Sequence, residues 1–73
     1  MAQETITAPL AGKVLKVCVK AGDKVNEDDE VCTLESMKME NTLYAPVSGT
    51  VTEVKVAAGQ FVQAGDTIAV IEY

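Results

Sequence analysis

The chain has 73 residues, which fits one small domain over residues 1–73, and 48% of them are apolar, enough for a folded core. Eleven acidic residues against six lysines give a net charge of −5, so neither nucleic acid nor an anionic membrane surface is an expected partner. Histidine is absent, which excludes a histidine base, a histidine metal ligand and a Ser–His or Cys–His nucleophile within this chain.

The sequence shows no targeting segment. Its first five residues lack the positive patch and the apolar stretch of a signal peptide, and no apolar run approaches the roughly 20 residues of a membrane span. The two thiols, Cys18 and Cys32, lack CxxC spacing. In a chain without a visible leader they indicate a reduced, cytoplasmic protein, and the sequence leaves open a single disulfide between them.

Short β-strands are expected along the whole chain. Valine occurs eleven times, and Gly, Pro and Asp interrupt the apolar stretches at short intervals. We expect strands at Thr5–Ala8, Lys13–Val19, Lys24–Val25, Val31–Glu35, Thr42–Ala45, Gly49–Val56, Phe61–Val62 and Thr67–Ile71. Pro9–Gly12 is expected to form a tight connection, and Ala21–Asp23 a hairpin turn with Gly22 in the left-handed region.

An internal repeat organises these strands. Residues 8–35 align without a gap with residues 45–72 at a constant offset of 37, and the matches fall on apolar and turn residues. Gly65 aligns with Asp28, so a positive φ is expected at both positions if the turn requires one. The repeat predicts two halves of the same local fold, paired about a pseudo-twofold axis.

Each half also shows a break in strand alternation. Val14 lies three residues before Val17, and Val51 stands in the same relation to Val54. A β-bulge, which adds one residue to the strand, would bring these valines onto one face. The alternative is that Val14 is simply exposed.

The repeat does not account for the segment from Ser36 to Tyr44, where the two halves join. The strand ending near Glu35 and the strand beginning near Thr42 predict a hairpin turn centred on Met37, Lys38 and Met39. Apolar side chains at an exposed turn gain no burial, so two methionines around a lysine indicate a recognition element that presents an amine. The alternative is that one methionine folds back onto the sheet as a filler and Lys38 is a solubilising charge.

The sequence Glu35-Ser36-Met37-Lys38-Met39-Glu40-Asn41 resembles the attachment motif of biotinyl domains, the biotin carboxyl carrier family. The similarity extends over nearly the whole chain and includes the turns at residues 9–12, 19–23, 46–49 and 56–59. It departs from the family at Ser36, where alanine is commoner. The resemblance implies a flattened eight-strand barrel of two four-stranded antiparallel sheets with pseudo-twofold symmetry, and a modified lysine on a hairpin tip.

The resemblance also implies a function. Lys38 would be joined through an amide to biotin by a biotin protein ligase, with Met37 and Met39 as contacts for the ligase and Glu35 and Glu40 as further polar contacts. The tethered biotin would carry a carboxyl group between a biotin carboxylase and a carboxyltransferase or decarboxylase. The domain itself would catalyse nothing, because the chemistry belongs to the cofactor and the partner enzymes.

Other functions are weighed against this one. A lipoyl domain shares the fold, but its lysine usually lies in a sequence resembling Asp-Lys-Ala, unlike Met37-Lys38-Met39. An unmodified β interaction module could use the two methionines as a docking patch. The acidic run Asn26–Glu30 lacks the alternating ligands and central glycine of a calcium loop, so a solvated loop is expected and no metal site.

The parent enzyme is only partly indicated. The halves align without a gap, so the inserted "thumb" of some acetyl-CoA carboxylase carriers is not expected. This favours the carriers of decarboxylases, other acyl-CoA carboxylases, pyruvate carboxylase or transcarboxylase. We expect either a free-standing carrier or a domain excised from a larger chain.

Overall fold

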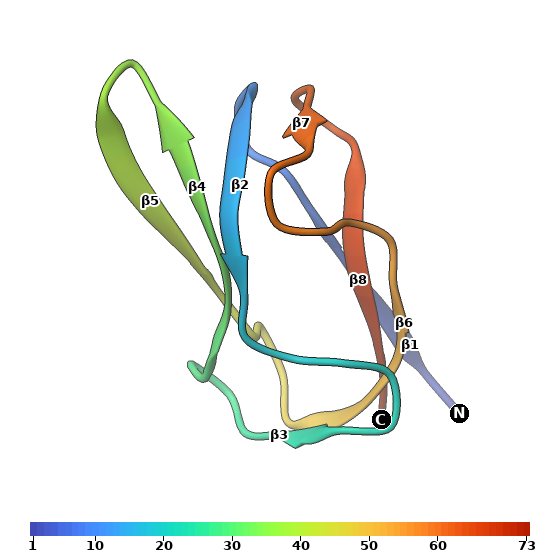
Figure 1. Ribbon diagram of the computed structural model, residues 1–73. Coiled ribbons are helices and arrows are strands. Elements are labelled where there is room, and N and C mark those ends of the chain that lie inside the picture. The colour runs from blue at the N-terminus through green and yellow to red at the C-terminus, as the bar shows by residue number, and fades with distance from the viewer.

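The computed structural model describes all residues from Met1 to Tyr73 and contains eight β-strands. They are β1 (Gln3–Thr7), β2 (Gly12–Val17), β3 (Lys24–Val25), β4 (Glu30–Ser36), β5 (Met39–Tyr44), β6 (Gly49–Val54), β7 (Phe61–Val62) and β8 (Thr67–Glu72). They form two antiparallel four-stranded sheets, ordered β1-β8-β6-β3 and β5-β4-β2-β7 (Figure 1). The expected all-β fold is therefore confirmed. No membrane-spanning helix is found.

The strand pairing has the predicted pseudo-twofold symmetry. An offset of 37 residues takes β1 to β5, β2 to β6, β3 to β7 and β4 to β8, and thereby converts one sheet order into the other. Each sheet combines strands from both halves of the chain. Neither half can therefore complete a sheet without the other.

The core lies between the two sheets and obeys the same symmetry. Its 13 apolar residues form six pairs at the repeat offset, together with Ile6, whose equivalent Leu43 is partly buried against the core. The pairs are Ala8/Ala45, Val14/Val51, Val25/Val62, Val31/Ile68, Cys32/Ala69 and Leu34/Ile71. Burial of such side chains is the dominant favourable term in folding, so the repeated residues are those that hold the sheets together.

The predicted bulges are present at equivalent places in β2 and β6. The register of β2 against β4 shifts between Val14 and Lys16, and that of β6 against β8 shifts between Val51 and Glu53. One extra residue in each strand returns the valines to the inner face. Val14 is fully buried and Val17 packs against the core, so the alternative of an exposed Val14 is wrong.

One turn prediction is corrected by the topology. The segment Ala21–Asp23 does contain a left-handed Gly22, with φ 97°, but it is not a hairpin because β2 and β3 belong to different sheets. The segment instead pairs with β6, where Gly22 N donates to Val51 O at 2.7 Å. The turns at Asp28 and Gly65 do require a positive φ, and the two residues adopt values of 75° and 91°.

The β4–β5 hairpin projects at one end of the molecule, and both termini lie toward the other end (Figure 1). The molecule is elongated and measures 36 × 18 × 16 Å. β5 begins at Met39 rather than at Thr42, because Ser36 and Met39 still pair across the hairpin. β2 and β6 end at Val17 and Val54, two residues earlier than expected, because the chain there crosses to the other sheet.

Candidate functional site

The turn at the hairpin tip is shorter than the sequence predicted. Ser36 pairs with Met39, so Met37 and Lys38 are the only two residues between the strands. Their φ angles are 53° and 66°, and two consecutive positive values are what a type I′ hairpin turn requires. Lys38 therefore occupies the second central position of the tightest common connection between two strands.

This turn is made from residues that do not favour it. Type I′ turns are dominated by Asn-Gly and similar pairs, whereas a residue with a larger side chain in the left-handed region costs about 1–2 kcal/mol. Neither Met37 nor Lys38 relieves that cost through a short polar side chain. Strained backbone of this kind is concentrated at functional sites, which points to a role for these two side chains beyond folding.

Both methionines beside Lys38 are in contact with solvent. Met37 is 92% exposed and Met39 is 67% exposed. Neither is packed into the core, so the alternative in which one methionine serves as a filler is wrong. The tip thus presents two flexible, apolar thioether side chains on either side of an amine, as a surface for recognition would.

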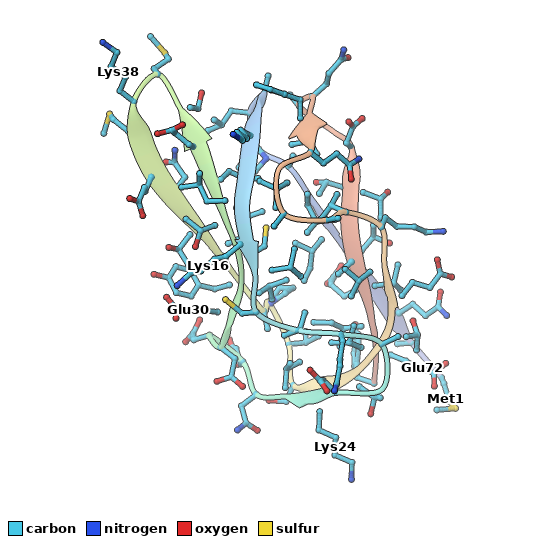
Figure 2. All side chains as sticks on the ribbon, in the orientation of Figure 1. Met1, Lys16, Lys24, Glu30, Lys38 and Glu72 are labelled. Atoms are coloured by element: carbon cyan, nitrogen blue, oxygen red, sulfur yellow. The ribbon has the colours of Figure 1, made fainter.

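The Lys38 side chain extends away from the tip (Figure 2) and takes part in no salt bridge. The one salt bridge in the structure joins Lys55 Nζ to Glu53 Oε2 at 2.7 Å. The other five lysines are exposed as well, as expected for charges on strands and turns. Lys38 differs from them by its position on the two-residue turn, where an unpaired primary amine can form an amide with a carboxylic acid that another protein has activated.

Glu35 and Glu40 lie directly opposite each other on β4 and β5, just below the tip. Both are exposed, and Glu35 is also paired with Lys13 of the neighbouring strand β2. Like charges at directly opposite positions are destabilising, and Lys13 forms no salt bridge with either glutamate. The two carboxylates that the sequence singled out therefore share one outer face of the sheet with Lys13.

A groove next to the tip was not predicted from the sequence. It has a volume of about 560 Å³ and is lined by residues of three segments, 11–13, 35–38 and 61–63. Among these residues is Phe61 of β7, which is 76% exposed and pairs with Lys13. The sequence did contain a signal for this groove, because the repeat aligns the apolar Phe61 with the charged Lys24 of the first half.

The two thiols lie outside the tip. Both are free, Cys18 exposed and Cys32 buried. Burial raises the pKa of the Cys32 thiol above its ordinary value of 9.0, and the proximity of Cys18 raises it further. Cys32 is equivalent to the buried Ala69, so its place in the fold is that of a small core residue.

The acidic run at residues 26–30 forms a turn. The Asp29 carboxylate accepts a hydrogen bond from Asn26 N at 2.8 Å, and Asp66 accepts the equivalent bond from Gln63 N at 2.9 Å. No group of three or more acidic or cysteine side chains is placed to hold a metal ion. The run is thus a structural feature shared by both halves.

Comparison with known families and structures gives one consistent match. A family model, Biotin_lipoyl, described as a biotin-requiring enzyme, matches residues 4–71. The chain is 33% identical to a urea carboxylase from Kluyveromyces lactis, with a TM-score of 0.89 over 99% of this chain and 6% of the other. The fold thus has a counterpart in a solved structure.

Two curated relatives match about half of the chain. The methylmalonyl-CoA decarboxylase subunit gamma of Propionigenium modestum is 54% identical over 37 residues, which are 51% of this chain and 28% of the relative. The biotin carboxyl carrier protein of Streptococcus mutans is 50% identical over 40 residues, which are 55% of this chain and 31% of the relative. The match covers less than a third of either relative.

Proposed function

The chain belongs to the biotin and lipoyl attachment family and is a biotin carrier domain, and we propose that Lys38 is the residue to which biotin is attached. The observation that carries the proposal is the tip itself. Lys38 stands on a strained two-residue turn, without an ion-pair partner, between two exposed methionines. Its primary amine fits amide formation with the carboxyl group of biotin.

The attachment step needs a second protein. A biotin protein ligase would present biotin as a mixed anhydride with AMP, the Lys38 amine would attack its carbonyl carbon, and AMP would leave as the amide forms. The nitrogen must give up a proton as the amide forms, and this chain has no histidine and no acidic side chain in contact with Lys38 Nζ. We therefore assign the base, like the activated cofactor, to the ligase.

We propose that the tip residues are what the ligase reads. Met37 and Met39 offer apolar contacts on both sides of the amine, and Glu35 and Glu40 offer acidic groups one strand residue below it. A rigid hairpin supports this assignment, because the ligase then meets all five side chains in one fixed arrangement. Met37 and Met39 would also keep a lipoate ligase from accepting the lysine.

Attached biotin supplies a ureido nitrogen that can take up and release a carboxyl group. This chain contributes the reach and position of that group, since Lys38 lies on the β4–β5 hairpin, at the end of the molecule that faces away from the termini (Figures 1 and 2). A group held on a tether meets its target at an effective concentration in the mM range. We propose that the partners are biotin carboxylase and a carboxyltransferase or decarboxylase component, in the cytoplasm, where free thiols such as Cys18 persist.

Intact-mass measurement after incubation with biotin, ATP and a biotin ligase tests the assignment. The wild-type chain should gain the mass of one biotin, and Lys38→Ala should gain none. Lys24→Ala is the matched control, because Lys24 is also exposed but lies on β3 away from the tip, and it should label like the wild type (Figure 2). Labelling of Lys38→Ala would overturn the proposal, and labelling of the wild type by a lipoate ligase alone would favour a lipoyl carrier.

A further inference from the structure

A groove lies beside the tip at the lysine end of the molecule, and no equivalent groove is found at the other end. Lys38 and Met37 line it together with residues 11–13 and 61–63, and its volume of about 560 Å³ is in the range of small-molecule sites. At the opposite end, Ser48 takes the place of Ala11, and its hydroxyl accepts a hydrogen bond from Glu27 N at 2.9 Å. Ala11 has no hydroxyl, so the equivalent hydrogen bond between the two loops cannot form at the lysine end.

A second difference between the two halves is Phe61, which lines the same groove. Its side chain is 76% exposed, whereas the equivalent position in the first half holds the exposed Lys24. The fold therefore accepts a charged residue at this position and does not need an aromatic one. An exposed phenylalanine is unfavourable in water, and here it is found only at the end that carries Lys38.

Four other groove residues carry polar side chains that suit one kind of ligand. Ser36, Gln63, Lys13 and Glu35 line it, so both hydrogen-bond donors and acceptors are present beside one aromatic ring. The bicyclic ring of biotin has an apolar thioether side and a ureido group with two N–H donors and one carbonyl acceptor. The groove thus offers a partner for each part of that ring.

We propose that the groove is a resting site for the biotin ring attached to Lys38, with Phe61 as its apolar platform. The inference rests on the proposed function, because the occupant is the cofactor on this chain's own lysine. Lys38 itself lines the groove, so the tether has only to fold back. With an effective concentration in the mM range, an intrinsic dissociation constant of about 1 mM already keeps the ring docked about half of the time.

Such weak docking would shelter the apolar ring from water between visits to the partner enzymes without holding it there. It also predicts that Phe61 affects how available the ring is to other proteins. Replacement of Phe61 by lysine removes the apolar platform. The fold should tolerate this change, because the equivalent position in the first half already holds Lys24.

The test compares backbone amide NMR spectra of the 73-residue chain before and after biotinylation, with the mass of one biotin verified first. We expect shift changes at residues 11–13 and 61–63 besides those at the tip, and none at the equivalent residues 48–50 and 24–26. In Phe61→Lys the changes at residues 11–13 should vanish. Lys24→Phe, the matched control at the far end, should behave like the wild type.

Capture of the biotinylated chain by streptavidin gives a second measurement. If the ring is docked half of the time, Phe61→Lys should be captured about twofold faster than the wild type, and Lys24→Phe at the wild-type rate. Shift changes confined to residues 36–39 together with equal capture rates would overturn the resting site and leave the proposed function intact. Absence of biotin in the mass spectrum would overturn both.

Discussion

Gly12 of β2 lies so close to Glu35 of β4 that a Cβ atom at position 12 would stand 2.5 Å from the Glu35 carbonyl oxygen. Gly49 has the same relationship to Glu72 at the other end of the molecule. The two contacts are equivalent in the repeat, but only the one at Gly12 lies directly below the turn that carries Lys38. Substitutions at the two glycines therefore distinguish an effect on the stability of the fold from an effect on the position of the hairpin tip.

We predict that Gly12→Ala and Gly49→Ala each lower the free energy of unfolding by about 1–3 kcal/mol, because the added methyl group forces the two strands apart. Urea denaturation measures this. Only Gly12→Ala should also slow biotinylation, by several-fold at a temperature where both variants remain folded, since it moves β4 next to the tip. Equal labelling rates for the two variants would show that β2 does not position the turn.

The strained turn predicts a conflict between stability and labelling at Met37. Met37→Asn should raise the free energy of unfolding by about 1 kcal/mol, because asparagine tolerates the left-handed region. That corresponds to a rise in Tm of about 4–8 °C for a domain of this size. The same variant should be biotinylated more slowly, because a ligase contact is lost.

Met39→Asn is the control for this effect. Met39 belongs to β5 and has no positive φ, so the substitution should bring no gain in Tm. A stability gain at position 39 equal to that at position 37, or no gain at either, would mean that the left-handed conformation of Met37 carries no strain.

The buried thiol of Cys32 makes stability depend on pH. Its pKa is raised in the folded state by burial and then by Cys18, so the unfolded chain loses this proton first as the pH rises. The contribution to stability is complete below the ordinary value of 9.0 and is lost as the pH rises through the raised pKa. Between the two values the free energy of unfolding should fall by up to about 1.4 kcal/mol per pH unit.

Cys32→Ala isolates this contribution, because the equivalent core position already holds Ala69. We predict a shallower fall in the free energy of unfolding above pH 9 for Cys32→Ala than for the wild type, measured by urea denaturation under reducing conditions. Cys18→Ser, at an exposed position, should retain most of the steep fall. Parallel pH profiles for the wild type and Cys32→Ala would contradict the assignment.

The opposed carboxylates of Glu35 and Glu40 predict a salt-dependent stability. Glu40→Gln removes the repulsion across the hairpin, so its Tm should exceed that of the wild type at low salt, and the difference should shrink at high salt. Glu53→Gln is the matched control, because Glu53 pairs with Lys55 and its loss should not raise the Tm. A lower Tm for Glu40→Gln at low salt would show that Glu40 makes a favourable contact instead.

The symmetric core could be predicted from the sequence because burial selects residue type, and the buried positions therefore match between the two halves. The bulges followed from the same matches, through the phase of Val14 and Val51. The hairpin expected at Ala21–Asp23 was wrong, because a turn signal reports the local backbone and not the sheet that the next strand joins.

The site was predictable in part. Lys38 and the methionines on either side of it could be identified because they break the repeat and match a known motif. The length of the turn could not be predicted, since neither Met37 nor Lys38 is a residue type that indicates a left-handed conformation. The groove was missed because it depends on a departure from the repeat. Phe61 differs from Lys24, and an alignment read for its identities passes over that difference.

The most direct measurement is the site of modification itself. Proteolysis of the ligase-treated chain, followed by tandem mass spectrometry of the peptides, distinguishes Lys38 from the other five lysines of the chain. We predict biotin on Lys38 alone. Biotin on any lysine of the strands or other turns, with Lys38 unmodified, would contradict the assignment of the hairpin tip as the attachment site.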